Sequence, residues 1–161
     1  MVGLGTGAVR AGGHWDTLGG SVRINLNNGT VNFKVDGLFL SYGSLFEYQG
    51  SDFTSPPISG IQIGQTGGVT QVKGTLVCNL DGTYGVNSIQ IDTPATTLDL
   101  QGNASFSGTF SGSLPAVCSS NTPYGQADDA FMIRIVSCPT VATPCPFADL
   151  WIAFGAVLRT H

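Results

Sequence analysis

The chain has 161 residues and a formal net charge of −4, and only 10% of its residues are charged, against about 25% in an average globular protein. This length is enough for one domain with a hydrophobic core. The six Lys and Arg are scattered, which argues against nucleic-acid binding, and no apolar run of about 18 residues predicts a membrane-spanning helix. A mean hydropathy of +0.20 predicts that some apolar surface is exposed or is buried against another subunit.

Residues 1–13 are rich in glycine and are expected to form a flexible arm, as a frayed terminus or as a strand added to a neighbouring subunit. This start does not have the pattern of a signal peptide, so either a leader was removed or the chain is cytosolic. Residues 14–161 are expected to form a single all-β domain.

Apolar and polar residues alternate over 22–26 and over 31–36, which predicts a hairpin of two strands with one wet face. Asn28-Gly29 predicts a type I′ turn between them. Residues 37–42 extend the second strand, with Gly37 marking a bulge or a bend. A loop is expected over 43–57 and a second hairpin turn at Asp81-Gly82.

Further strands are predicted over residues 58–65, 69–80, 86–91, 104–110, 130–136 and 148–159. No stretch shows a sustained helical period with caps. About eight to ten short strands separated by Gly and Pro predict an all-β fold, either an antiparallel β-sandwich of jelly-roll type or a β-barrel.

The four cysteines form an even set, which favours an oxidising compartment and a leader that has been removed. Cys138 and Cys145 flank a loop with two prolines that a local disulfide can close. Cys78 and Cys118 each follow an apolar run, and we predict that they pair at neighbouring strand ends. The alternatives are a zinc site, which the lack of a C-x-x-C pair disfavours, and one disulfide with two free thiols.

Several short motifs follow one another in a recognisable order. They are Gly12–Trp15, Val35–Leu38, Val72–Cys78, Thr93–Thr96, Gly102–Gly108, Leu114–Cys118 and Trp151–Gly155. This order resembles a group of uncharacterised secreted β proteins of bacteria over roughly residues 12–159. The resemblance implies secretion, an all-β fold and pairing of the Cys78 and Cys118 positions, and it implies no activity. The loop 138–145 looks like an addition to that pattern.

One histidine stands beside a carboxylate, in His14-Trp15-Asp16. A base held by an acid is one interpretation, and a packed tryptophan with polar neighbours is the one we favour, because rigid placement is difficult next to a glycine-rich arm. No catalytic residue is therefore assigned. No Gly-x-Ser-x-Gly nucleophile motif occurs in the chain.

Asp128-Asp129 is the one adjacent pair of acids. We interpret these two as solvated charges that guard a strand edge, with Arg134 neutralising one of them. A calcium site is the alternative, although the regular spacing of a calcium loop is absent. No other metal ligand and no cofactor is predicted.

Exposed aromatic side chains can stack on sugar rings. Tyr84 in a turn and Tyr124 in a Pro-Gly loop are the candidates, together with Trp15, whereas Trp151 is expected in the core. A barrel lumen lined by Phe106, Phe110 and Phe131 is the corresponding site for a small apolar ligand.

Two asparagines, Asn28 and Asn103, begin N-glycosylation sequons whose use depends on the host. The position of Asn28 is equally explained by its turn.

The scarcity of titratable groups and the excess of small and apolar residues predict a non-catalytic, secreted or cell-surface subunit of a structural assembly. Low charge weakens the repulsion between copies, so we expect a homo-oligomer or filament. The alternative is a module that binds carbohydrate or a small apolar ligand. A small-molecule enzyme is a third hypothesis, with Arg134, Asp128 and Asp129 as the residues to mutate.

Overall fold

The computed structural model describes residues 15–40, 66, 68–78, 89–119, 129–138, 145 and 148–156. These residues form antiparallel strands, one short 3₁₀ helix and no α-helix, so the predicted all-β fold is confirmed. The strands are β1 (Trp15–Asp16), β2 (Gly19–Asn25), β3 (Thr30–Asp36), β4 (Phe39–Leu40), β5 (Gln71–Cys78), β6 (Ile89–Asp92), β7 (Thr96–Thr97), β8 (Ala104–Thr109), β9 (Ala130–Ser137) and β10 (Trp151–Ala156). The 3₁₀ helix η1 covers Ala116–Ser119.

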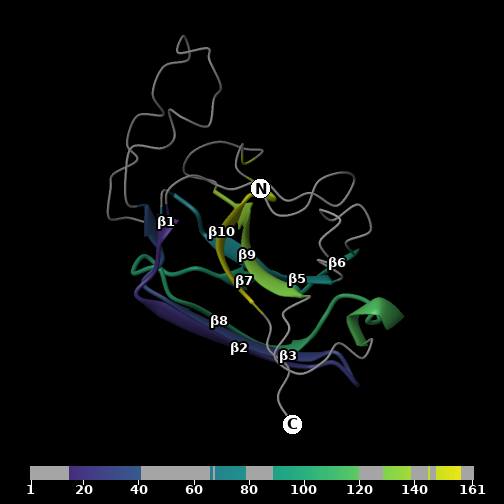
Figure 1. Cartoon of the computed structure of the whole chain (residues 1–161). Coiled ribbons are helices and arrows are strands. Elements are labelled where there is room, and N and C mark those ends of the chain that lie inside the picture. The colour runs from purple at the N-terminus through teal and green to yellow at the C-terminus, as the bar shows by residue number, and fades with distance from the viewer. Residues whose placement is uncertain are drawn as a thin grey trace, which may run out of the picture.

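One layer of the fold is a three-stranded sheet in the order β2-β3-β8. The alternation predicted from the sequence is present, since Val31, Phe33 and Val35 are buried and the residues between them are exposed. Alternate side chains of a strand point to opposite faces, so this sheet has one apolar and one polar face. Figure 1 shows it as the lower layer of the molecule.

The turn between β2 and β3 differs from the prediction. Asn25 pairs with Thr30, which leaves a longer loop than a two-residue turn. A type I′ turn needs positive φ at both central residues, but of the two only Gly29 has it (φ 71°). The side chain of Asn28 instead accepts hydrogen bonds from the backbone N–H (3.0 Å) and hydroxyl (2.6 Å) of Thr30, which holds the loop in its wider form.

The second strand of the hairpin does not continue to residue 42 as expected. It ends at Asp36, because Gly37 has positive φ (61°) and turns the chain into β4, which pairs with β1. The side chain of Asn103 accepts a hydrogen bond from the backbone N–H of Gly37 (3.0 Å). The bend predicted at Gly37 is therefore present, and β3 ends there.

The other layer is a five-stranded sheet in the order β10-β9-β5-β6, with β7 paired to β5 on the same edge as β6. Thr93 fills the gap between β6 and β7. Its backbone N–H donates to the carbonyl of Gly74 (2.8 Å), and its hydroxyl accepts from the N–H of Gly74 (2.9 Å). β5 is buried on both faces from Gly74 to Cys78, which fits the apolar run Leu76-Val77-Cys78 at its end.

The two layers pack face to face (Figure 1). Their core is mainly aliphatic and includes several phenylalanine rings. The ring centroid of Phe33 on β3 lies 5.8 Å from that of Phe106 and 5.5 Å from that of Phe131. Gly74 leaves room for the Phe131 ring, because a Cβ at this position would overlap it. Within the described residues the sheets are open, so the fold is a sandwich rather than a barrel. Phe110 and Phe131 pack in its core and Phe106 packs against it, so these rings do not line a barrel lumen as expected.

Both predicted disulfides are present. Cys78 at the end of β5 pairs with Cys118 in η1, with a Cα–Cα distance of 5.1 Å. Cys138 pairs with Cys145 at a Cα–Cα distance of 5.2 Å. No cysteine is free, so the alternatives of a zinc site and of free thiols are wrong. Two disulfides fit an oxidising extracellular environment.

Candidate functional site

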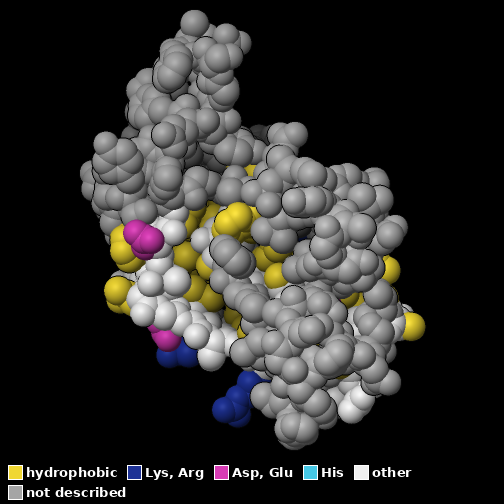
Figure 2. Space-filling model, in the orientation of Figure 1, with side chains coloured by type: hydrophobic (Ala, Val, Ile, Leu, Met, Phe, Trp, Pro, Cys, Tyr) yellow, Lys and Arg dark blue, Asp and Glu magenta, His cyan; other side chains and the backbone are white. Residues whose placement is uncertain are grey.

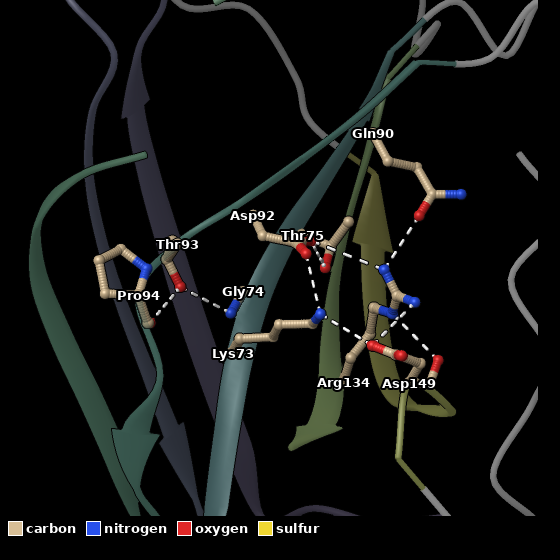
Figure 3. A network of polar contacts seen from close by, with 9 residues as sticks. All are labelled: Lys73, Gly74, Thr75, Gln90, Asp92, Thr93, Pro94, Arg134 and Asp149. Carbon is tan, nitrogen blue, oxygen red and sulfur yellow. Dashed lines mark hydrogen bonds and ion pairs between the residues drawn. The ribbon is translucent and has the colours of Figure 1, made fainter. Parts of the chain in front are cut away.

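Four charged side chains gather on the outer face of the five-stranded sheet (Figure 3). Lys73 of β5 lies directly opposite Arg134 of β9 in the strand register. Like charges opposite one another destabilise a sheet, so this pair needs carboxylates nearby. Asp149 accepts from Lys73 Nζ at 2.8 Å and lies 3.3 Å from Arg134 Nη2, and Asp92 lies 2.9 Å from Lys73 Nζ and 3.6 Å from Arg134 Nη1. We call these four residues the charge cluster.

Asp149 has a left-handed backbone, with φ of 68°, and no other described residue except glycine has positive φ. Aspartate tolerates this conformation better than most residues, but it still costs about 1 kcal/mol. Arg134 holds the residue in place, because its Nε donates to the carbonyl of Asp149 (3.0 Å). The backbone N–H of Asp149 also donates to the carbonyl of Ile135 (2.8 Å). The bend that leads into β10 is thus coupled to the charge cluster.

The pKa shifts of Lys73 and Asp149 favour the charged form of each group. Burial alone lowers the pKa of Lys73, but hydrogen bonds to Asp149 and Asp92 outweigh it and the pKa lies above its ordinary value. The hydrogen bond from Lys73 holds the pKa of Asp149 below its ordinary value, although partial burial acts in the other direction. Lys73 is therefore protonated and Asp149 ionised at neutral pH. A general acid or base needs a pKa near the working pH, so these two groups are poorly suited to proton transfer.

Two neutral side chains also bond to the cluster. Arg134 Nη1 donates to the side-chain oxygen of Gln90 (3.0 Å), and the hydroxyl of Thr75 donates to Asp92 (2.6 Å). Arg134 is 12% exposed and Lys73 is 19% exposed. An anionic ligand would have to displace internal partners to reach either cation. The cluster is best explained as a device that fixes the strand register and the bend at Asp149.

The outer face of the three-stranded sheet has a different chemistry. Its exposed side chains are mostly neutral and short: Ser21, Arg23, Asn25, Asn32, Lys34, Ser105, Ser107 and Thr109. Lys34 forms an ion pair with Asp36 (2.7 Å). Among the residues that the structure describes, Arg23 has no ion-pair partner on this sheet. This face can therefore approach another surface without a large cost for removing charge from water.

β2 is an edge strand. The backbone N–H of Phe110 donates to the carbonyl of Gly29 (3.2 Å), in line with the β3–β8 register, so residues 31, 33 and 35 turn their backbone groups toward β8. The N–H and C=O groups of residues 30, 32, 34 and 36 of β3 therefore face β2, where these residues pair with residues 25, 23, 21 and 19. Gly20, Val22 and Ile24 must turn their N–H and C=O groups to the other side. No strand within the described ranges pairs there.

A cavity of about 190 Å³ opens between the two layers beside β2. Its wall includes Gly19, Gly20, Val22, Phe33, Phe131 and Ile133. Figure 2 shows apolar side chains of described residues at the surface between the layers. The edge of β2 thus combines backbone groups that no described strand pairs with and adjacent apolar surface.

Only part of the predicted ligand site lies in the described structure. Trp15 is half-buried and packs against the main core, which limits its use as a stacking platform. Tyr84, Tyr124 and His14 lie outside the described residues. Trp151 is half-buried and packs against a second, smaller cluster on the outer side of the five-stranded sheet, rather than in the main core as expected.

The interpretation of the Asp128-Asp129 pair is corrected in part. Asp129 is 5% exposed, so it is a buried group and not a solvated edge charge, and Asp128 lies outside the described residues. Arg134 forms its ion pairs with Asp92 and Asp149, because the β5–β9 register places it beside Lys73. In the described part of the chain, no three metal-ligating side chains come together.

The two sequon asparagines have structural roles. Asn28 caps its own loop, and Asn103 donates through Nδ2 to Asp99 (3.1 Å) while it accepts from Gly37. Sequence reasoning missed Lys73, Asp92 and Asp149 as members of a site. The available signal was a single lysine within the apolar run 72–78, since a charge in a strand buried on both faces needs a partner.

Comparison with protein-family models, with curated proteins and with solved structures found no match to this chain. The resemblance to secreted bacterial β proteins stays a prediction. No helix among the described residues is long and apolar enough to cross a membrane.

Proposed function

We propose that the protein is a non-catalytic structural or assembly subunit that works outside the cell and associates with copies of itself through low-charge β surfaces. The observation that carries this proposal is the outer edge of β2, with which no described strand pairs, beside a nearly neutral sheet face. Natural proteins guard exposed edge strands with charges, prolines or bulges, because an open edge pairs readily with another strand. β2 has one charge, Arg23, and no proline.

The charge cluster supports the same proposal by a different route. It gathers two of the six Lys and Arg of the chain on the outer face of the other sheet, where carboxylates neutralise them. Its fixed charges do not favour acid–base catalysis. The disulfides support a protein of the extracellular space.

Light scattering after size-exclusion chromatography tests the proposal, over a concentration series in oxidising buffer. We expect the mean mass to rise above 16.7 kDa with concentration, because association follows mass action. A mass that stays monomeric at the highest soluble concentration contradicts self-association.

A binding module is the second candidate, and the cavity beside β2 favours it. At about 190 Å³ it is smaller than the roughly 300–1,000 Å³ of drug-sized sites, so it suits only a small apolar ligand. Titration with an apolar fluorescent probe tests this function, and a glycan array with a Tyr84→Ala control tests sugar binding. Silence in both assays removes this candidate.

A further inference from the structure

We propose that two copies of this chain pair through β2 in an antiparallel, two-fold arrangement with Val22 opposite the partner's Val22. This inference rests on the proposed self-association and names the surface and register that produce it. The occupant of the edge is a second copy, and the interface is a continuous sheet in the order β8-β3-β2 followed by the partner's β2, β3 and β8.

The phase of the hydrogen-bond ladder selects the register. Gly20, Val22 and Ile24 point their N–H and C=O groups outward, so only registers that place these residues opposite one another form hydrogen bonds. With Val22 opposite the partner's Val22, Gly20 meets the partner's Ile24 and all three residues of each copy are paired. A shift by two residues in either direction leaves one of the three unpaired on each copy.

Charge selects the same register. On the polar face, Arg23 then lies opposite the partner's Ser21, and the two arginines lie diagonal to one another. A shift by two residues toward Asn25 would place Arg23 directly opposite the partner's Arg23, and like charges in that position destabilise a sheet. A shift in the other direction avoids this contact but loses hydrogen bonds. The register centred on Val22 is the one that satisfies both conditions.

The burial pattern shows what a second copy would cover. Val22 and Ile24 point toward the sandwich interior but are only half-buried, and among the described residues no strand pairs with β2 on its outer side. Leu18, just before β2, is 83% exposed. The register places Leu18 beside the partner's Leu26, which is also half-buried. Two-fold pairing therefore covers apolar groups at the centre and at both ends of the strand.

Amide hydrogen exchange of the unmodified protein, followed by NMR, tests the pairing directly. In dilute solution we expect fast exchange at Gly20, Val22 and Ile24, and slow exchange at Ser21 and Arg23, whose N–H groups bond to β3. At concentrations where light scattering shows dimers, exchange at the first three should slow by at least about tenfold, while the other two stay unchanged. These two groups of amides are neighbours in one strand, so each is the control for the other.

Cysteine cross-linking tests the register. Ser21→Cys and Arg23→Cys are prepared as separate chains, both at exposed positions. In a non-hydrogen-bonded pair the Cα atoms lie about 4.5 Å apart, which a disulfide can span. We expect a covalent dimer when the two chains are mixed and oxidised, and little from either chain alone.

The outcomes separate this inference from the proposed function. Cross-linking of Arg23→Cys alone, or of Ser21→Cys alone, shows a shifted register and overturns the inference. Dimers with fast exchange at Val22 and Ile24 show association through another surface, which overturns the inference and leaves the proposed function standing. A protein that is monomeric at all concentrations overturns both.

Discussion

Replacing Asp149 by asparagine removes the carboxylate that lies between Lys73 and Arg134 and keeps the size of the side chain. Asparagine tolerates the left-handed backbone of this position as well as aspartate does, so the change isolates the charge. The variant leaves two neighbouring cations, 19% and 12% exposed, with Asp92 as their one remaining carboxylate in the cluster.

The expected loss of stability follows from the two interactions that disappear. Hydrogen bonds to charged groups contribute about 1.5–3 kcal/mol when shielded, and exposed ion pairs contribute about 0.2–1 kcal/mol. Asp149 is 64% exposed while its partners are largely buried, so its contribution falls between these ranges. We expect the Asp149→Asn variant to lose about 1–2 kcal/mol in the free energy of unfolding.

The stability contribution of Asp149 is expected to depend on pH, and the direction follows from its pKa. The pKa of Asp149 is lower in the folded protein than its ordinary value of 3.8, so its contribution is fully present above that value. The contribution is lost as the pH falls through the folded pKa. The stability difference between the original protein and Asp149→Asn should therefore be constant from neutral pH down to about pH 5, and should shrink below pH 4.

Urea unfolding of both proteins with intact disulfides, monitored by circular dichroism across this pH range, measures the difference. The control is Asp16→Asn, at an exposed carboxylate outside the cluster, which should change stability by less than about 0.5 kcal/mol. No difference at pH 7, or an equal difference at pH 7 and pH 3, refutes the reasoning that the ionised carboxylate holds the cluster together.

Three further predictions concern packing, association and cross-links. Gly74→Ala should cost about 1–3 kcal/mol in thermal or urea unfolding, because the methyl group meets the ring of Phe131, whereas Gly112→Ala has open space and should cost much less. Arg23→Thr should tighten self-association about two- to threefold at low salt, measured by sedimentation, because it removes a repulsion across roughly 7–8 Å in water. Replacing both cysteines of the Cys78–Cys118 pair by serine should destabilise more than the same change at Cys138–Cys145, by roughly 1–2 kcal/mol, since the sequence separations are 40 and 7.

Most of the fold was predictable because its strands have local signals. Alternation over 22–26, 31–36 and 104–110 corresponds to real strands with one buried face, and the run at 130–136 is a strand buried on most positions. The Cys138–Cys145 disulfide also followed from loop length, whereas Cys118 pairs with Cys78 as predicted but lies in η1 and not at a strand end. These features depend on residues that are close in the chain or on one period, which a single sequence contains.

The wrong predictions have physical causes that cannot be read from a local sequence pattern. The turn at Asn28-Gly29 is wider than predicted: the backbone N–H of Gly29 donates to the carbonyl of Asn25 (2.9 Å), and the Asn28 side chain bonds to Thr30. The charge cluster joins β5, β6, β9 and the bend before β10, and its members are brought together by strand register and by the bend at Asp149. Asp129 was interpreted as exposed from its charge, yet it is buried. Register and burial are long-range properties, so these points required the structure.

The outer faces of the two sheets differ in the number and pairing of their charged side chains. This difference indicates which sheet associates with a second chain. On the five-stranded sheet, Lys73 and Arg134 are already partly removed from water and paired with carboxylates, so a second surface would gain little there and would disturb a balanced set. On the three-stranded sheet, Arg23 is the one exposed charge on the edge strand, and no described strand pairs with the backbone groups of Gly20, Val22 and Ile24. Hydrogen bonding, apolar cover and charge separation can all be satisfied there by one arrangement of two chains. If association instead used the charge cluster, self-association would weaken steeply with salt and with Asp149→Asn, whereas pairing through β2 predicts little sensitivity to that substitution.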